Sequence, residues 1–367
     1  MNISTNQYFD EAVELLLRLI KVPSFSNEED EAATIWFHRL KQHGCDVKRF
    51  HNNIYTMASG YDSSKPILML NSHIDTVKPV ASYTRDPFGA EISDGKIYGL
   101  GSNDAGGSGV ALAATFLTLK DREDLPFNLM LALTASEERM GELGMRAFLP
   151  YLNDEKLYPS MAIVGEPTEC KAAIAERGLV VCDVEVEGVS GHAARNEGVN
   201  AIYRAIEDIG KIKNMKWPKV SDVLGDIKVS VTMIEAGTQH NVIPDRCRYV
   251  VDMRTTDAFS NEESVEKLSE TTRWSKFTPR STRIRASVLE AGSPLLLAAE
   301  KSGMDTFISP TTSDMALMYD IPSIKIGPGK SQRSHSADEF IELKEIDQGI
   351  STYLLYIDSL AGVCRSI

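Results

Sequence analysis

The stretch PILMLNSHID, residues 66–75, decides the fold, because a short apolar run leads directly into a histidine and an aspartate. Two further apolar runs end in the same way: NLMLAL (128–133) is followed by TASEE, and MAIV (161–164) by GEP. Uninterrupted apolar runs of this length are typical of strands that are buried on both faces of a partly parallel sheet. Ligands gather outside the carboxyl ends of such strands, so we expect the polar residues that follow the runs to converge.

Helical patterns alternate with these apolar runs. Apolar residues recur at helical spacing in FDEAVELLLRLIKV and EEDEAATIWFHRLKQHG, and the second pattern stops at a glycine. The chain returns to the same alternation near its C-terminus. The predicted helices cover residues 9–22, 28–44, 110–120, 293–302 and 344–360, and a further strand covers 322–327. This alternation predicts an α/β domain with a mostly parallel mixed sheet flanked by helices.

The pattern changes in the middle of the chain. In LVVCDVEVEGV (179–189) apolar and acidic residues alternate, which is typical of a strand with one solvated face. The segments that follow are predicted as helix 199–212, strands 227–234 and 248–254, helix 261–273 and strand 282–290. Their order, β-α-β-β-α-β, is that of a ferredoxin-like α+β sandwich. We therefore expect a catalytic domain in two parts, 1–176 and 291–367, with an inserted lid domain at 177–290.

Composition excludes several classes of protein. The 367 residues include 39 Lys and Arg against 52 Asp and Glu, and this net charge of −13 disfavours non-specific nucleic-acid binding. No segment has the eighteen or so apolar residues that cross a bilayer, and MNISTNQYFD at the start lacks the layout of a secretory signal. Five scattered cysteines argue against a disulfide framework or a thiolate zinc site. We expect a cytoplasmic protein.

Polar residues at the strand ends suggest a metal site. His73 and Asp75 are two residues apart, so in an extended segment both side chains project to the same side. Asp104 lies in the glycine-rich stretch YGLGSNDAGGSG, which opens the predicted helix, and one carboxylate there can bridge two metals. A phosphate-binding loop is the competing interpretation, but no Gly-Lys-Ser/Thr follows.

Three more segments complete the candidate set. The neighbours Glu137 and Glu138 should point in different directions, so that one binds a metal while the other moves a proton. A solvated acidic turn is the alternative interpretation of this pair. With Glu166 and the distant His335, the set supplies nitrogen and oxygen ligands for two divalent ions. Such ligands suit two zinc ions, with cobalt or manganese as alternatives.

The sequence resembles the acetylornithine deacetylase and succinyl-diaminopimelate desuccinylase family of dinuclear-zinc amidohydrolases. The resemblance covers nearly the whole chain, in the family's order, through the motifs SHIDTV, the Asp104 loop, TASEE, VGEPTE, SGHAA, HNVIPDRC with VDMR, and HSADEF. It implies that His73 and Glu166 bind one zinc, that Glu138 and His335 bind the other, and that Asp104 bridges them. It also implies that Asp75 orients His73 and that Glu137 is the general base.

The resemblance extends to the predicted lid. His192 is similar to the family histidine that polarises the scissile carbonyl, commonly from the partner subunit of a homodimer, with a structural histidine as the alternative. Asn241 and Arg254 match positions that contact the substrate or support its carboxylate. Two departures leave the substrate open. Asp104-Ala-Gly-Gly stands where many relatives have Asp-Met-Lys-Gly, and Arg195 follows GHAA where relatives often have tyrosine.

The expected function is hydrolysis of an N-acyl amino acid, first of all N-acetyl-L-ornithine or N-succinyl-L-ornithine in arginine biosynthesis. Desuccinylation of succinyl-diaminopimelate is the nearest alternative, and a dipeptidase is a further one. A different class is a metal-binding scaffold that has lost catalysis, but retention of Glu137 beside the five ligands argues against it. The expected partner is a small-molecule substrate, with no membrane or nucleic acid.

Overall fold

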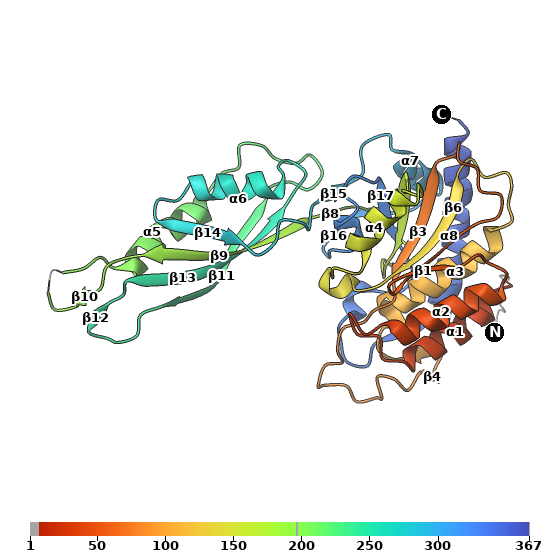
Figure 1. The fold of residues 1–367 in the computed structure, drawn as a ribbon, viewed down its shortest axis with the longest axis horizontal. Coiled ribbons are helices and arrows are strands. Elements are labelled where there is room, and N and C mark those ends of the chain that lie inside the picture. The colour runs from red at the N-terminus through yellow and green to blue at the C-terminus, as the bar shows by residue number, and fades with distance from the viewer. Residues whose placement is uncertain (1–6, 196, 367) are drawn as a thin grey trace. The chain divides into compact units, whose positions relative to one another are not determined.

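The computed structural model describes residues 7–195 and 197–366, which form two compact units (Figure 1). The larger unit comprises Met1–Ile174, Leu289–Ile308 and Ser313–Ile367, and the smaller unit comprises Ala175–Val288 and Ser309–Thr312. The larger unit is thus built from stretches that are distant in sequence.

A mixed sheet forms the centre of the larger unit. Its strands lie in the order β1-β2-β6-β3-β7-β17-β8. The bounds are β1 (Lys48–Phe50), β2 (Asn53–Met57), β3 (Ile67–His73), β6 (Asn128–Thr134), β7 (Met161–Gly165), β8 (Ala172–Glu176) and β17 (Ser323–Ile326). The four central strands, β6, β3, β7 and β17, run parallel, whereas β1, β2 and β8 pair antiparallel at the two sides. The predicted α/β class with a mostly parallel sheet is confirmed.

Both faces of this sheet are covered, which explains the uninterrupted apolar runs. Along β3, Leu68 and Leu70 belong to one hydrophobic core, while Met69 between them belongs to the other. Most of the helices cover the first core: α1 (Phe9–Ile20), α2 (Asp30–Gln42), α3 (Gly107–Leu119), α7 (Pro294–Lys301) and α8 (Leu343–Cys364). Helix α4 (Met145–Asp154) packs on the second core. Every side chain of such a strand is therefore removed from water.

The smaller unit is an antiparallel sheet covered on one face by two helices (Figure 1). The elements follow in the chain as β9 (Gly178–Glu187), α5 (Ala201–Asn214), β11 (Lys228–Ala236), β13 (Arg246–Thr255), α6 (Asn261–Glu270) and β14 (Ser275–Pro279). The sheet order is β11-β13-β9-β14. This is the predicted β-α-β-β-α-β arrangement. A separate ribbon pairs β10 (Gly191–His192) with β12 (Val242–Ile243).

The prediction of the last strand of this sheet at 282–290 is wrong. Strand β14 (Ser275–Pro279) takes that place and pairs with β9, with Phe277 packed against the core. Within 282–290 the structure contains only a bridge between Ile284 and Leu179 and the short β15 (Ser287–Val288), which pairs with the end of β8. The sequence SKFTP alternates too briefly, and ends in a proline too early, to stand out as a strand.

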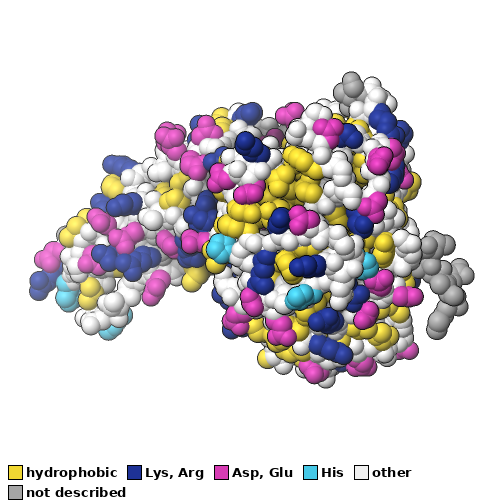
Figure 2. Space-filling model, turned by 45° about the vertical axis from the view of Figure 1, so that its right-hand side comes forward, with side chains coloured by type: hydrophobic (Ala, Val, Ile, Leu, Met, Phe, Trp, Pro, Cys, Tyr) yellow, Lys and Arg dark blue, Asp and Glu magenta, His cyan; other side chains and the backbone are white. Residues whose placement is uncertain are grey.

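The larger unit also contains a small three-stranded sheet. It contains β4 (Glu91–Ser93), β5 (Lys96–Tyr98) and β18 (Phe340–Glu342), in the order β18-β5-β4. The short strand β16 (Thr306–Ser309) pairs with β8 and belongs to the central sheet. Among residues 7–195 and 197–366, no helix is both long and apolar enough to span a membrane. Basic and acidic side chains are interspersed on the face shown in Figure 2.

Candidate metal centre

The candidate site lies at the carboxyl ends of three neighbouring parallel strands. His73 is the last residue of β3, the Glu137–Arg139 turn follows β6, and Glu166 directly follows β7. Because β6, β3 and β7 are adjacent and parallel, their ends meet at one edge of the sheet. His73 and Glu137 are at most 8% exposed, so the sheet edge holds them away from water.

Asp104 lies between two histidines. Its Oδ1 is 3.3 Å from Nε2 of His73, which in turn is 3.7 Å from Oε1 of Glu166. Its Oδ2 is 3.7 Å from Nε2 of His335, which in turn is 2.9 Å from Oε2 of Glu138. Each oxygen of Asp104 thus faces a different histidine and its acidic neighbour, which is the arrangement that a bridging carboxylate requires.

Two overlapping groups of side chains have the spacing of metal ligands. His73, Asp104 and Glu138 form one group, and His73, Glu137 and Glu166 form the other, with ligand atoms within 4.8 Å of one another in each. Ligand atoms bound to one zinc at about 2.0–2.2 Å stand about 3–4 Å apart, so modest adjustment would bring these groups into coordination. Imidazole nitrogens and carboxylate oxygens without thiolate suit zinc, cobalt or manganese. The residues present therefore fit divalent cations.

Asp75 orients both His73 and the Glu137–Arg139 turn. Nδ1 of His73 donates to the backbone carbonyl of Asp75 at 2.9 Å, which leaves Nε2 as the lone-pair donor toward the cluster. The Asp75 carboxylate accepts the backbone N–H groups of Glu137 and Glu138 at 2.9 and 3.2 Å, and the hydroxyl of Ser26 at 2.7 Å. One buried carboxylate thus connects the ends of β3 and β6.

A second buried carboxylate, Glu29, holds the residue that precedes this turn. It accepts the backbone N–H and the hydroxyl of Ser136 at 3.0 and 2.8 Å. Ser136 has φ 56° and Met140 has φ 48°, left-handed conformations that non-glycine residues adopt rarely. Such conformations persist only where the surroundings enforce them, and they cluster at functional sites. Glu29 and Asp75 supply that enforcement on either side of Glu137.

Crowding of carboxylates raises several pKa values when the protein groups alone are considered. Burial, followed by the charges of Glu166 and Asp314, raises the pKa of Glu137 well above its usual range, although His73 opposes the shift. Burial is also the main cause that raises the pKa of Glu166 to about 8 and that of Asp314 to about 6. Divalent cations would relieve this repulsion by replacing the protons.

The two histidines respond to the same acidic surroundings. The hydrogen bond to Glu138 raises the pKa of His335 to about 9, with burial opposing. Burial by itself would lower the pKa of His73, but Asp104 and Asp75 outweigh it and raise the value well above the usual range. Both rings therefore have proton-attracting neighbours, and cations would compete with protons for them.

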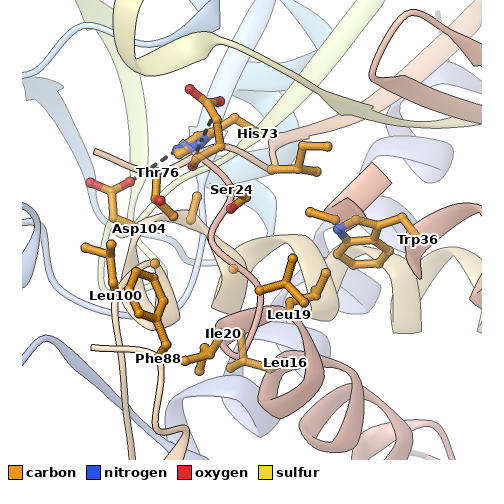
Figure 3. A pocket seen from close by; sticks show the side chains of 17 residues that line it. Leu16, Leu19, Ile20, Ser24, Trp36, His73, Thr76, Phe88, Leu100 and Asp104 are labelled. Atoms are coloured by element: carbon orange, nitrogen blue, oxygen red, sulfur yellow. Dashed lines mark hydrogen bonds and ion pairs between the residues drawn. The ribbon is translucent and has the colours of Figure 1, made fainter. Parts of the chain in front are cut away.

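A small cavity lies behind His73 (Figure 3). His73, Asp75 and Asp104 form its polar end, and apolar side chains of α1 and α2, with Phe88 and Leu100, line the rest. Its volume of about 30 Å³ suffices for one or two water molecules. The cavity is thus part of the packing behind the ligands, and too small for an acylated amino acid.

The structure brings together seven of the predicted site residues and places three others in the smaller unit. The seven in the larger unit are His73, Asp75, Asp104, Glu137, Glu138, Glu166 and His335. His192 is exposed in β10, and its Nδ1 accepts the backbone N–H of Ala194 at 3.1 Å. Asn241 accepts the N–H of Ala193 through its backbone carbonyl at 3.0 Å, and Arg254 forms an ion pair with Asp252 at 2.8 Å.

Sequence reasoning missed three buried acidic residues around the cluster: Glu29, Asp314 and Glu339. They are 1%, 1% and 2% exposed. Glu339 lies in the HSADEF motif that pointed to His335, so its place four residues after a candidate ligand was a usable signal. Glu29 and Asp314 carried no such signal, because an acidic residue in a single sequence is usually a surface residue.

Comparison with known proteins agrees with this geometry. The model of Peptidase family M20/M25/M40 matches residues 69–359. Among curated proteins, a succinyl-diaminopimelate desuccinylase of Wolbachia pipientis wMel is 26% identical, over 95% of this chain and 92% of its own length. The succinyl-diaminopimelate desuccinylase of Xylella fastidiosa is also 26% identical, over 95% of this chain and 98% of its own length.

Solved structures show the same fold. Aminopeptidase PepT from Bacillus cereus superposes with a TM-score of 0.76 at 18% identity, covering 96% of this chain and 99% of that one. The YXEP protein of Bacillus subtilis, described as a dinuclear metal binding peptidase from the M20 family, has a TM-score of 0.74 at 16% identity and covers 98% and 99%. At these identities the similarity concerns the fold.

Fold, site and family match together define the class of this protein as a metal-dependent hydrolase. The chain belongs to Peptidase family M20/M25/M40, whose model covers most of it. The resemblance drawn from the motifs is thereby confirmed.

Proposed function

We propose that this protein hydrolyses the amide bond of an N-acyl amino acid, releasing a carboxylate and a free amine. The observation that carries the proposal is the convergence of His73, Asp104, Glu138, Glu166 and His335 at one sheet edge with Glu137 beside them. We propose two zinc ions as the metals, held by His73 and Glu166 on one side and by Glu138 and His335 on the other, with Asp104 shared.

When bound, such a metal pair would supply Lewis acidity, which lowers the pKa of water and polarises a carbonyl. Glu137 would take a proton from the attacking water, whose oxygen bonds to the acyl carbon, and would pass that proton to the nitrogen of the leaving amine as the C–N bond breaks. Its burial and its acidic neighbours favour proton uptake near neutral pH. Asp75 and Glu29 fix the backbone of the turn that carries Glu137, so the Glu137 carboxylate is positioned before the substrate binds.

Because the relatives are named succinyl-diaminopimelate desuccinylases, we propose N-succinyl-L,L-diaminopimelate as the first candidate substrate in place of acetylornithine. The corresponding pathway is lysine biosynthesis in place of arginine biosynthesis. N-acetyl-L-ornithine and N-succinyl-L-ornithine, expected first from the sequence, rank second. The fold of an aminopeptidase is shared as well, so dipeptides belong in the same test. A small-molecule biosynthetic role suits the cytoplasm, which we propose as the location.

We propose that the protein is a homodimer joined through the smaller unit, with His192 serving the site of the partner subunit. Strand β11 is an edge strand, with Met233 and Ile234 66% and 56% exposed. On the adjoining helix α5, Tyr203 and Ile206 are 72% and 58% exposed. Exposed apolar side chains and an unpaired strand edge are each common features of self-association surfaces. His192 would then stabilise the charge that develops on the carbonyl oxygen.

A substrate panel tests the proposal. The zinc-loaded protein is assayed for free amine release from N-succinyl-L,L-diaminopimelate, N-acetyl-L-ornithine, N-succinyl-L-ornithine and several dipeptides, with Glu137→Gln as the matched inactive control. We expect the highest kcat/KM with the succinylated diamine. Faster hydrolysis of another compound would reassign the substrate, and zinc binding without hydrolysis of any of them would favour the scaffold alternative.

A further inference from the structure

Glu339 is a buried acidic residue to which neither the family motifs nor the proposed chemistry gave a role. It is 2% exposed and lies four residues after His335, immediately before β18. Its Oε2 accepts the backbone N–H of Gly101 at 3.0 Å, and its Oε1 accepts those of Asn103 and Asp104 at 2.8 and 2.9 Å. A carboxylate that accepts three backbone N–H groups fixes the path of the loop that donates them.

That loop is a single irregular turn, Ser102–Gly106, in which the backbone N–H of Gly106 donates to the carbonyl of Gly101 at 2.9 Å. Asp104 and Ala105 have extended or irregular dihedral angles between the αL residue Gly101 and helix α3. At Gly101 (φ 73°), a Cβ atom would lie 2.5 Å from a methyl group of Thr76, so the close approach requires glycine. The position of the Asp104 carboxylate therefore depends on the hydrogen bonds that the loop backbone makes with other segments, including those to Glu339.

The segment that carries Glu339 is tied to the same loop at further points. Strand β18 pairs with β5, which runs directly into the loop, and the backbone N–H of Gly99 donates to the carbonyl of Glu339 at 2.9 Å. The Asn103 side chain exchanges two hydrogen bonds with the backbone of Lys330, at 2.9 and 3.1 Å. The chain between Lys330 and β18 also carries His335, so one set of bonds positions both groups.

Resting on the proposed function, we propose that Glu339 is the positioning residue that sets Asp104 at the distance from His335 needed for both to bind one cation. Glu339 acts through the loop backbone and touches neither metal nor substrate. Both oxygens of Glu339 accept N–H groups, so an amide nitrogen in place of one oxygen, or a shorter side chain, cannot accept all three hydrogen bonds. Loss of such a supporting acceptor typically weakens metal affinity by about 10–100-fold.

The smaller unit offers a matched control. Asp208 is also fully buried, and its carboxylate accepts the backbone N–H groups of Arg273, Trp274 and Ser275 at 2.9, 2.7 and 2.9 Å. Replacing it by asparagine removes an equivalent acceptor at a place unrelated to the metal ligands. A purely structural role for Glu339 would make the two substitutions alike.

The test is calorimetric titration of Zn²⁺ into the chelator-treated wild type, Glu339→Gln and Asp208→Asn, with a melting curve for each. We expect Glu339→Gln to bind at least one zinc 10–100-fold more weakly and Asp208→Asn to bind as the wild type does, although both melt earlier. Cobalt loading adds a second readout, since an altered ligand position changes the visible absorption spectrum of the bound ion.

Wild-type zinc affinity in Glu339→Gln would overturn the inference and leave the proposed function intact. Absence of zinc binding in the wild type would instead overturn the proposed function. Should Glu339→Gln not fold, Glu339→Asp replaces it, because this variant keeps the charge but draws the carboxylate back by one methylene. The same weakening is expected of it, and unchanged affinity would again contradict the inference.

Discussion

The metal cluster of the larger unit and the candidate substrate contacts of the smaller unit are built in opposite ways. Around the cluster, the buried carboxylates Asp75, Glu29 and Glu339 hold the ligand-bearing backbone through hydrogen bonds of 2.9–3.0 Å. In the smaller unit, His192 and Asn241 are exposed, and Arg254 is paired with its own neighbour in β13. A site that must bind cations before any substrate arrives is preorganised, whereas groups that act on substrate are left free to engage it.

Metal removal should have the largest effect on activity, because it acts on the cluster in the larger unit alone. Prolonged chelation is expected to abolish hydrolysis, and added zinc should restore it, because the proposed chemistry needs the Lewis acidity of the metals to lower the pKa of the water that Glu137 deprotonates. Turnover and metal content by plasma emission are measured on the same samples. Undiminished turnover in protein shown to lack metal would contradict the proposal.

Replacing Glu137 by glutamine should remove proton transfer while leaving the ligands in place. We expect kcat to fall by about 10²–10⁴-fold with two zinc ions retained. Glu138→Gln is the adjacent control, and it should lose metal instead, because Glu138 hydrogen-bonds His335 within the cluster. Near-normal turnover in Glu137→Gln would show that the base lies elsewhere.

His192→Ala tests the exposed region. Loss of one donor to the developing oxyanion should lower kcat by about 10²–10³-fold, with zinc affinity unchanged. If the histidine serves the partner's site, a mixture of His192→Ala and Glu137→Gln chains should regain activity, since the mixed dimer has one intact site. Equal inactivity of the mixture and its components would place His192 in its own subunit's site or outside the chemistry.

The pH dependence of metal binding tests the cluster without any substitution. Without cations, the raised pKa values of His335, about 9, and Glu166, about 8, mean that both groups are mostly protonated at pH 7. A cation must displace those protons, so zinc affinity should rise between pH 6 and pH 9 by up to about tenfold per pH unit for each proton released. Proton release can be measured by calorimetry in buffers of different ionisation enthalpy. Affinity independent of pH would contradict these shifts.

The sequence was sufficient to predict the strands and helices that have a regular pattern of apolar residues. The apolar runs ending at His73, Glu137 and Glu166 gave the central parallel strands, because a strand buried on both faces has no polar interruption. Strand β14 was misplaced, since its burial depends on Phe277 packing against a core assembled from distant segments.

The buried acidic residues Glu29 and Glu339 could not be predicted from sequence patterns, because their partners are also distant in sequence. Glu29 is 107 residues from its partner Ser136, and Glu339 is 235 residues from Asp104. Nothing local distinguishes them from surface glutamates until the chain has folded. The substrate could not be predicted for another reason: the departures at Ala105-Gly106 and Arg195 change residues within the family motifs without showing what they recognise.

We propose that six side chains from distant segments meet around a pair of cations, with Asp104 shared between them. Anomalous diffraction at the zinc edge, from crystals of zinc-loaded protein, would locate these cations. We expect two peaks, both within coordination distance of Asp104, one beside His73 and Glu166 and the other beside Glu138 and His335. A single peak, or peaks remote from Asp104, would contradict it.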